Sequence, residues 1–423
     1  MQFRQFSPRR CAFLLAAFFT AAALADPANA QKPPPPDTVA LLKQHTHAFT
    51  LTPERTISGP GADFLAKATA NTQFFLFGED HHDRDTQLLA SAIYRLLKKE
   101  HGYEHAVVEL DPLGVEMLLA PGVRSDVKRM GEAIRRYPTS IGFASDQDLQ
   151  FLADAAAANS GANAIWGIEQ VQSATLHLEQ LQKLAPDARR KGAVAALLAD
   201  ARTSESDRAR MVEFLATNPN TFGRLQELQK TFEAKAGSKA DALLTGLVKS
   251  AEIYSYYRRS EAGEFVGLYN NTVREEWLKR GFLERYRAAA KGGKLPKAFF
   301  KFGSWHMIRG RNPGGAWTTS NLAHELATVN GKEAYGIDVV AFGGYTPAAE
   351  APPWMRPLLP PTPPESPVLI DLRPLRPLGR FFTEQVEEKH RPRLRDEIHA
   401  YDALVILPNS GKATWDLTGF PVP

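Results

Sequence analysis

Cysteine is almost absent from this chain of 423 residues, in which Cys11 is the single example. Cys11 lies inside a predicted N-terminal export signal, so we expect the mature chain to contain none. Disulfides, thiolate metal ligands and a cysteine nucleophile are therefore excluded, even in an oxidising compartment. Burial of apolar side chains must supply the stability of the fold.

A large excess of charge of one sign is also lacking. Lysine and arginine number 51 against 47 aspartate and glutamate residues, which gives a formal charge of +4. A nucleic-acid-binding protein usually carries a clustered and much larger basic excess, so we expect no nucleic acid as a partner. After residue 30 no stretch reaches about 18 uninterrupted apolar residues, so we expect no integral membrane span after signal cleavage.

The first thirty residues have the three parts of a secretory signal peptide. Arg9 and Arg10 contribute to a basic start, an apolar run covers residues 12–25, and the sequence Ala-Asn-Ala at 28–30 offers a small-x-small cleavage site. We therefore expect a periplasmic or secreted protein that begins at Gln31. The twin arginines leave both the Sec and the Tat route of export open.

Short apolar runs alternate with helical patterns along the rest of the chain. Such runs are typical of strands that are buried on both faces of a parallel sheet. The segments that we interpret as strands cover residues 73–77, 105–110, 164–168, 297–302, 334–342 and 403–407. Strand, loop, helix and strand in succession form a βαβ unit with a right-handed crossover. We predict an α/β fold, a three-layer sandwich with a mostly parallel sheet.

A long helical segment interrupts the strand pattern. Residues 171–292 show helical periodicity without a convincing strand, and we interpret them as a helical insertion that forms a lid. Eleven prolines between residues 347 and 377 favour an extended arm. The predicted organisation is a signal peptide (1–30), a linker and helix (31–70), the two halves of the α/β core (71–170 and 293–346), the insertion (171–292), and a proline-rich arm with a last strand (347–423).

Polar residues follow four of these apolar runs directly. Ligands bind beyond the carboxyl ends of the strands in open α/β sheets, so neighbouring parallel strands would bring these residues into one crevice. The candidates are Glu79, His81 and His82 after the first run, Glu109 after the second, Glu169 after the third, and His306 and Arg309 after the fourth. Glu169 has the alternative role of a charge at the start of a helix.

These residue types permit hydrolysis by an activated water molecule. A neutral imidazole can remove a proton from water near neutral pH, and a carboxylate such as Glu79 or Glu109 can fix its tautomer. His306 or Arg309 is expected to stabilise the oxyanion of an ester-like substrate. No serine lies in a Gly-x-Ser-x-Gly elbow, so we expect no covalent nucleophile.

The same side chains also match a metal site. His81, Glu109 and His306 would supply three ligands and leave an open position for water, as catalytic zinc or manganese requires. No His-Glu-x-x-His helix is present. A site that requires no cofactor and a site with a divalent metal therefore both stay open. A third alternative is a binding protein without catalysis that holds haem or another ligand.

Two Gly-x-x-His elements follow apolar runs, at residues 78–81 and 303–306, and the helical insertion separates them. Together with Glu109 they resemble a superfamily that joins erythromycin esterases, ChaN-like haem-binding uptake proteins and TraB/Tiki proteins. The sequence KFGSWHMIRG, followed by a helix, a strand and a Gly-rich turn, is most similar to the erythromycin esterase-like branch. The resemblance covers residues 74–415, but the insertion and the proline-rich arm match only in position.

This resemblance implies an exported hydrolase that acts on an ester or lactone-type bond of a small molecule, with Glu79, Glu109 and His306 among its catalytic residues. The esterase motif Gly-Glu-x-x-His selects His82, whereas the ChaN-like and Tiki forms select His81. This chain has both histidines, and the esterase-like spacing favours His82. The other branches imply a metal-dependent hydrolase or protease, or a haem-binding protein.

The insertion contributes candidate substrate-binding residues of its own. Tyr254, Arg258 and Arg274 lie in helices that lead back to the fourth predicted strand, so we expect some of them to point into the crevice. The sequence indicates no oligomeric state.

Overall fold

The computed structural model describes residues 36–161, 163–206, 210–343, 351–360 and 364–420. The predicted signal peptide, residues 1–30, lies outside these ranges, as do parts of the proline-rich arm. Within the described ranges, no helix combines the length and the apolar character that crossing a membrane requires.

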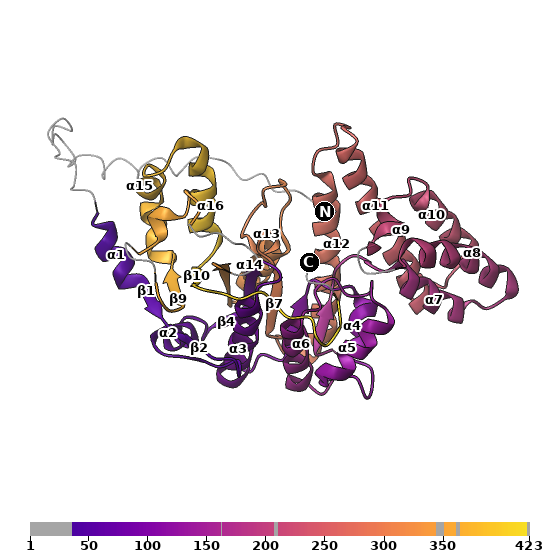
Figure 1. Ribbon diagram of the computed structural model, residues 1–423, viewed down its shortest axis with the longest axis horizontal. Coiled ribbons are helices and arrows are strands. Elements are labelled where there is room, and N and C mark those ends of the chain that lie inside the picture. Colours follow the sequence, from indigo (N-terminus) through magenta and orange to yellow (C-terminus); the bar gives the residue numbers. More distant parts are fainter. Residues whose placement is uncertain (1–35, 162, 207–209, 344–350, 361–363, 421–423) are drawn as a thin grey trace, which may run out of the picture.

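One eight-stranded sheet organises the molecule (Figure 1). Its strands lie in the order β1 (Thr46–Ala48), β9 (Val368–Asp371), β10 (Ala403–Leu407), β8 (Glu333–Ala341), β4 (Thr72–Glu79), β7 (Ala298–Gly303), β5 (His105–Val108) and β6 (Ile165–Gly167). Every pair from β10 to β6 is parallel, while β9 pairs antiparallel with β10 and β1. The prediction of a mostly parallel sheet is confirmed. A separate ribbon joins β2 (Thr50–Leu51) to β3 (Ile57–Ser58).

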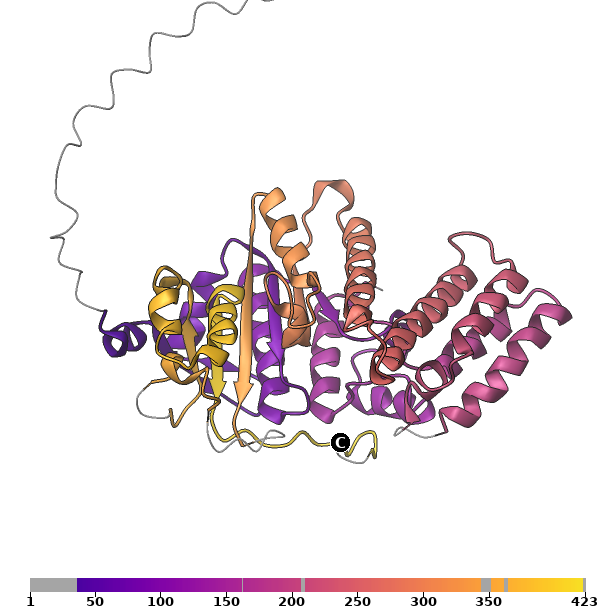
Figure 2. The ribbon, with the colours of Figure 1, turned by 90° about the horizontal axis from the view of Figure 1, so that it is seen from above.

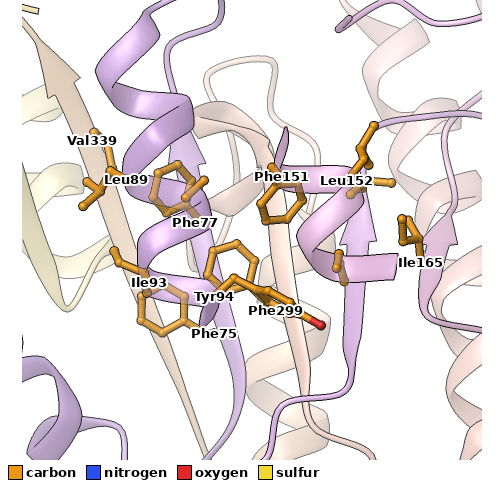
Figure 3. Close-up of a cluster of buried hydrophobic side chains, with 14 of the residues drawn as sticks. Phe75, Phe77, Leu89, Ile93, Tyr94, Phe151, Leu152, Ile165, Phe299 and Val339 are labelled. Carbon is orange, nitrogen blue, oxygen red and sulfur yellow. The ribbon is translucent and has the colours of Figure 1, made fainter. Parts of the chain in front are cut away.

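The large apolar side chains of the central strands point alternately to the two faces of the sheet, and both faces are therefore buried. On one face, the rings of Phe75 and Phe299 stack with centroids 5.3 Å apart, and Tyr94 meets Phe299 edge-on (Figure 3). The helices on this face are α2 (Pro60–Ala68), α3 (Arg84–His101), α4 (Pro112–Leu118), α5 (Val127–Arg136) and α6 (Asp146–Ala158).

The opposite face has an apolar layer of its own. Phe74 and Phe300 pack against Phe282, with ring centroids 5.5 and 5.0 Å away. The elements on this face are α1 (Thr38–His45), α12 (Tyr269–Ala289), α13 (Ser304–Met307), α14 (Thr319–Val329), α15 (Gly379–Thr383) and α16 (Arg391–Ala400). Helices on both faces of one sheet make the predicted three-layer sandwich.

The helical insertion divides into two parts. The first is a group of helices with its own apolar core, which extends sideways beyond α4 and α5 (Figures 1 and 2). Its helices are α7 (Ala174–Leu184), α8 (Ala188–Ser204), α9 (Glu213–Ala216), α10 (Thr221–Phe232) and α11 (Lys239–Glu261). The second part is α12, which packs Leu278 and Phe282 onto the sheet. The insertion thus supplies one helix of the sandwich, and its role as a lid stays a prediction.

Two strands fall in segments for which the sequence analysis proposed a linker or an arm. β9 lies directly after Pro367 inside the proline-rich segment, and β1 lies in the predicted linker region. Each has only three or four residues, which is too short for an alternating pattern to be recognised. The N-terminal region therefore supplies the edge strand β1, and the proline-rich segment supplies its neighbour β9.

Candidate active site

The carboxyl ends of β4, β7, β5 and β6 lie side by side. In the parallel register, Glu79 at the end of β4 is the partner of Gly303 at the end of β7. β5 pairs with β7 on one side and with β6 on the other, so Glu109 and Glu169 follow the next two strands of the row. The strand-end residues selected from the sequence therefore meet at one edge of the sheet.

His81 is the first-loop histidine that lies among these carboxylates. Its Nδ1 is 3.0 Å from Glu79 Oε1, and its Nε2 is 3.8 Å from Glu109 Oε2. The imidazole also stacks on the Phe143 ring, with centroids 4.0 Å apart. Since a carboxylate only accepts, Nδ1–H donates to Glu79, and Nε2 is left as the basic nitrogen.

The same surroundings change the acidity of His81. Burial lowers its pKa, but the hydrogen bond to Glu79 and the charge of Glu109 outweigh burial, so the net pKa is raised. The Nε2 atom faces Gly303 so closely that a Cβ at that position would lie 3.0 Å from it. Any larger residue at position 303 would therefore crowd the basic nitrogen, and glycine avoids this contact.

His82 takes a different direction from the loop. Its φ is 70°, a left-handed conformation, and its carbonyl oxygen accepts from the Ala413 N–H at 3.0 Å. Its ring lies beside Trp415, with centroids 5.7 Å apart. The two histidine rings stay close, with centroids 6.1 Å apart, and both lie beside Phe143. The contacts of His81 with Glu79 and Glu109 favour His81 over the His82 that the esterase-like spacing selects, and this choice stays a prediction.

A buried lysine links Glu79 to the helix layer. Lys301 Nζ lies 3.0 Å from Glu79 Oε1 and 2.9 Å from Asp148 Oδ1. Burial lowers the pKa of Lys301, but the charges of Asp148 and Glu79 raise it by a larger amount. The ammonium group therefore stays charged. The sequence analysis did not select Lys301 or Asp148. A lysine inside an apolar strand was the available signal, because a buried ammonium needs carboxylate partners.

A small cavity of about 20 Å³ borders Glu79, Glu109, Asp148 and Lys301. The rest of its lining is apolar: Val108, Leu110, Phe143, Phe151 and Leu152. Its volume is about that needed for one water molecule.

Arg274 reaches the site from α12 of the insertion. Its Nε lies 2.9 Å from Glu169 Oε1, and its Nη2 donates to Glu109 Oε1 at 2.6 Å and to the second oxygen of Glu169. Glu109 also accepts from the Gly303 N–H at 2.8 Å. Burial raises the pKa of Glu109, but the electrostatic effects of His306, Arg274 and His81, together with the Gly303 N–H, outweigh burial and lower it to about 2. Glu109 is therefore ionised near neutral pH.

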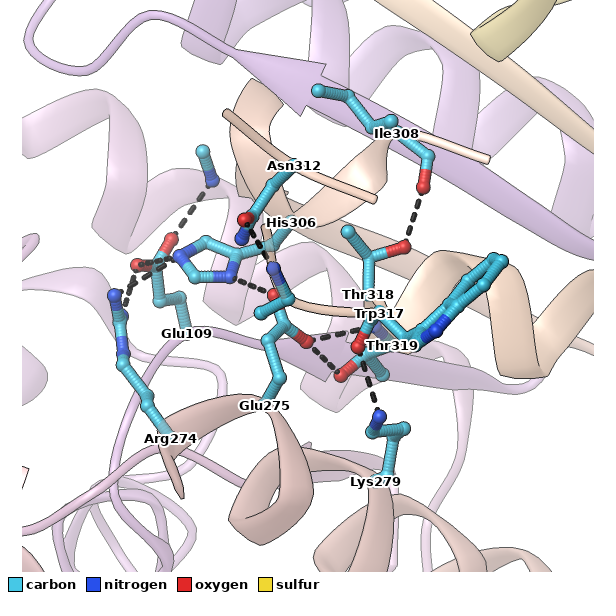
Figure 4. A network of polar contacts seen from close by, with 12 residues as sticks. Glu109, Arg274, Glu275, Lys279, His306, Ile308, Asn312, Trp317, Thr318 and Thr319 are labelled. Atoms are coloured by element: carbon cyan, nitrogen blue, oxygen red, sulfur yellow. Dashed lines mark hydrogen bonds and ion pairs between the residues drawn. The ribbon is translucent and has the colours of Figure 1, made fainter. Parts of the chain in front are cut away.

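His306 is held from both sides (Figure 4). Its Nδ1 lies 2.6 Å from Glu275 Oε1, and its Nε2 lies 3.0 Å from Nη1 of Arg274. The distance from Nε2 to Glu109 Oε1 is 3.7 Å. Glu275 was missed in the sequence, since a glutamate in the middle of a long charged helix gives no local sign of burial.

Three predicted residues lie elsewhere or at the margin. Arg309 pairs with Asp402 at 3.1 Å, beside the start of β10, and so faces the opposite end of the parallel strands. Arg258 donates to the Ala216 carbonyl at 2.7 Å within the insertion. Tyr254 lies near the Gln170 and Glu169 side chains, and burial raises its pKa. The expected oxyanion role of Arg309 is therefore corrected, because its contacts hold it away from His81 and His306.

The geometry does not suit the predicted metal ligands. Glu109 accepts from the Gly303 N–H and from Arg274, and Nε2 of His306 faces Nη1 of Arg274. A guanidinium thus occupies the place in which a cation would join these ligands. In the described part of the chain, no group of three or more His, Cys, Asp or Glu side chains is arranged to hold a metal ion.

Comparison with solved structures places the fold. A Bacillus cereus protein aligns with a TM-score of 0.57 and 12% identity, over 89% of this chain and 98% of that chain. An erythromycin esterase, EreC, solved as a histidine-to-asparagine mutant in its open conformation, aligns with a TM-score of 0.54 and 14% identity, over 88% and 99% of the two chains. A succinoglycan biosynthesis protein aligns with a TM-score of 0.54 and 11% identity, over 90% and 98%.

These likenesses show that the chain has an erythromycin esterase-like fold, as the motifs predicted. No protein-family model matches the chain, and no curated protein sequence matches it significantly. The identities of 11–14% are evidence for the fold alone.

Proposed function

We propose that this protein is a hydrolase that cleaves an ester or lactone-type bond of a small molecule with a water molecule activated by His81. The observation that carries the proposal is the pairing of His81 Nδ1 with Glu79, which leaves Nε2 as a base close to Glu109 and to the glycine at position 303. The similarity of the fold to that of an erythromycin esterase also supports the proposal.

The first step is attack by water on the carbonyl carbon. His81 Nε2 takes one proton from the water as its oxygen bonds to that carbon, and the carbonyl oxygen becomes an oxyanion. Glu79 stabilises the imidazolium that forms, because its carboxylate accepts from Nδ1–H. In the second step the bond from carbon to the leaving oxygen breaks, and the imidazolium returns its proton to that oxygen. The products are a carboxylic acid and an alcohol, and the enzyme is regenerated.

Arg274 is the group that we expect to meet the oxyanion. A guanidinium has five N–H donors, and four of those in Arg274 point to Glu169, Glu109 and His306. The fifth, on Nη1, has no acceptor among the residues that the structure describes. A charged donor that neighbouring groups already hold in place needs no reorganisation when the oxyanion forms, which is the basis of transition-state stabilisation.

The mechanism assigns no step to a metal or to haem, because Arg274 and Lys301 neutralise the carboxylates. We also propose that the protein is exported through residues 1–30, on the evidence of their sequence pattern. Cell fractionation of the full-length chain checks export, and a protein that keeps its N-terminus and stays in the cytoplasm contradicts it.

The test of function uses the purified chain from Gln31 onward. We expect it to hydrolyse at least one member of a panel of small esters and lactones, with the same rate before and after treatment with a chelator. Metal analysis and a haem absorption spectrum are recorded on the same sample. Hydrolysis that a chelator abolishes would favour the metal-dependent alternative, and a haem spectrum without hydrolysis would favour the binding protein.

A further inference from the structure

Two adjacent residues of α12 hold the two nitrogens of the His306 ring. Glu275 faces Nδ1 at 2.6 Å, and Arg274 faces Nε2 at 3.0 Å (Figure 4). A carboxylate accepts hydrogen bonds and a guanidinium donates them. The two contacts are satisfied together only if Nδ1 carries the proton and Nε2 offers its lone pair.

The Glu275 carboxylate is itself fixed in position. Its side chain is 1% exposed, and its second oxygen accepts from the Thr319 backbone N–H at 2.7 Å and from Thr319 Oγ1 at 2.8 Å. Thr319 is the first residue of α14, and Thr318 caps this helix by accepting from Asn321 N–H. Glu275 therefore makes three hydrogen bonds, two of them to Thr319 at the start of the neighbouring helix α14, and cannot rotate away from His306 without losing them.

The opposite tautomer of His306 would be unfavourable in this environment. An Nε2–H would point at a donor of Arg274, and an Nδ1 lone pair would point at a carboxylate oxygen. Both contacts would then be repulsive. The choice of tautomer thus depends on Glu275, and the Nε2 lone pair that results is what holds Nη1 of Arg274.

We propose that Glu275 is a positioning residue, which fixes the Nδ1–H tautomer of His306 and thereby orients Arg274 toward the substrate. Glu275 does not touch the reacting atoms, and it acts through His306. The kinetic part of this inference rests on the proposed ester hydrolysis, whereas the part that concerns the tautomer does not.

The experiment compares Glu275→Gln with Glu276→Gln. Glu276 is the next residue of α12 and is exposed, so the second variant makes the same chemical change outside the site. Nitrogen-15 NMR of histidine-labelled protein reports the tautomer of His306, whose signal is assigned with a His306→Gln variant. We expect the Nδ1–H form in the unmodified protein and in Glu276→Gln, and a mixture of tautomers in Glu275→Gln.

The kinetic readout separates positioning from binding. In Glu275→Gln we expect kcat to fall roughly 10- to 100-fold, the range seen when carboxylates that orient metal-bound histidines are replaced. KM should change little, and Glu276→Gln should keep both constants. Thr319→Val, which removes one of the three hydrogen bonds of Glu275, should give a smaller loss of kcat.

Two results would overturn the inference. One is an Nε2–H tautomer of His306 in the unmodified protein, which can be read even if Glu275→Gln fails to fold. The other is a folded Glu275→Gln protein whose tautomer and kcat equal those of Glu276→Gln. If no ester is hydrolysed but the tautomer shifts as expected, the positioning role stands and the proposed reaction is the part that fails.

Discussion

The two histidines of the site are held in different ways. His81 has one nitrogen bonded to Glu79 and the other near Glu109 at 3.8 Å, and its side chain is 28% exposed. His306 has both nitrogens engaged, by Glu275 and Arg274, and its side chain is 8% exposed. A base needs an available lone pair and access to water, whereas a group that orients another needs fixed contacts on both sides. In the proposed mechanism, this difference supports proton transfer by the His81 half and orientation by the His306 half.

The two halves also differ in where their residues come from. The His81 half uses Glu79, Lys301 and Asp148, all of the α/β core. The His306 half depends on Arg274 and Glu275, which belong to the insertion and pack against the core through α12. Glu109 connects the two halves, because it accepts from Arg274 and lies 3.8 Å from His81 Nε2.

The largest expected effect separates His81 from its neighbour. His81→Asn removes the base, so we expect kcat to fall by roughly 10²- to 10⁴-fold, the usual contribution of general-base catalysis. His82→Asn should keep most of the activity, since asparagine tolerates the left-handed conformation of that position. Steady-state kinetics of both variants, with circular dichroism to check folding, decide the point. A severe loss in His82→Asn with a mild loss in His81→Asn would reverse the assignment.

Arg274→Lys tests the other half of the comparison. Lysine keeps the positive charge but cannot contact Glu109, Glu169 and His306 at once, because it lacks the planar fork of arginine. We expect kcat to fall by about 10²-fold, as for the loss of one oxyanion donor. Full activity in a correctly folded Arg274→Lys protein would argue that the oxyanion is stabilised elsewhere.

A pH profile of Glu79→Gln tests the coupling within the His81 half. In the native protein the pKa of His81 is raised, since Glu79 and Glu109 outweigh burial, and the histidine must be neutral to act as a base. Removing the Glu79 charge lowers that pKa. The acid limb of kcat/KM should therefore move to lower pH, while the rate at the plateau falls about tenfold because the imidazolium is less stabilised. An acid limb that stays in place would show that another group titrates.

Much of the sheet and half of the site follow from local patterns. Glu79, Glu109 and His306 stand directly after apolar runs, and the edge of a parallel sheet must bring such residues together. The choice of His81 over His82 depends on the backbone turn at residue 82, where φ is 70°. Sequence spacing does not reveal such a turn.

Other contacts join residues that are far apart in the chain. Lys301 meets Asp148 across two layers, and Glu275 meets Thr319 between two helices. Arg309 shows the opposite error, since it follows His306 closely in sequence but pairs with Asp402 beyond the other end of the strands. Proximity along the chain predicts a shared site only while the chain stays at one edge of the sheet.

The smallest expected effect on activity belongs to Asp148→Asn. Asp148 contacts Lys301 but neither His81 nor His306, and Lys301 keeps Glu79 as a partner. We therefore expect kcat to fall only a few-fold. Stability should fall by about 1.5–3 kcal/mol at pH 7, the contribution typical of a hydrogen bond to a charged group. Burial raises the pKa of Asp148, but Lys301 and Ser145 outweigh burial, so the folded pKa is lowered.

The sign of that shift gives the prediction a second readout. A carboxyl whose folded pKa is lowered stabilises the fold above its unfolded pKa of about 3.9, and this contribution is lost as the pH falls through the folded pKa. Thermal unfolding should therefore show the largest difference in Tm between the native protein and Asp148→Asn near neutral pH, and a shrinking difference below about pH 4. If Asp148→Asn instead lowered kcat as much as His81→Asn while Tm stayed unchanged, the Lys301 contact would belong to the chemistry, and the division between the two halves would have to be redrawn.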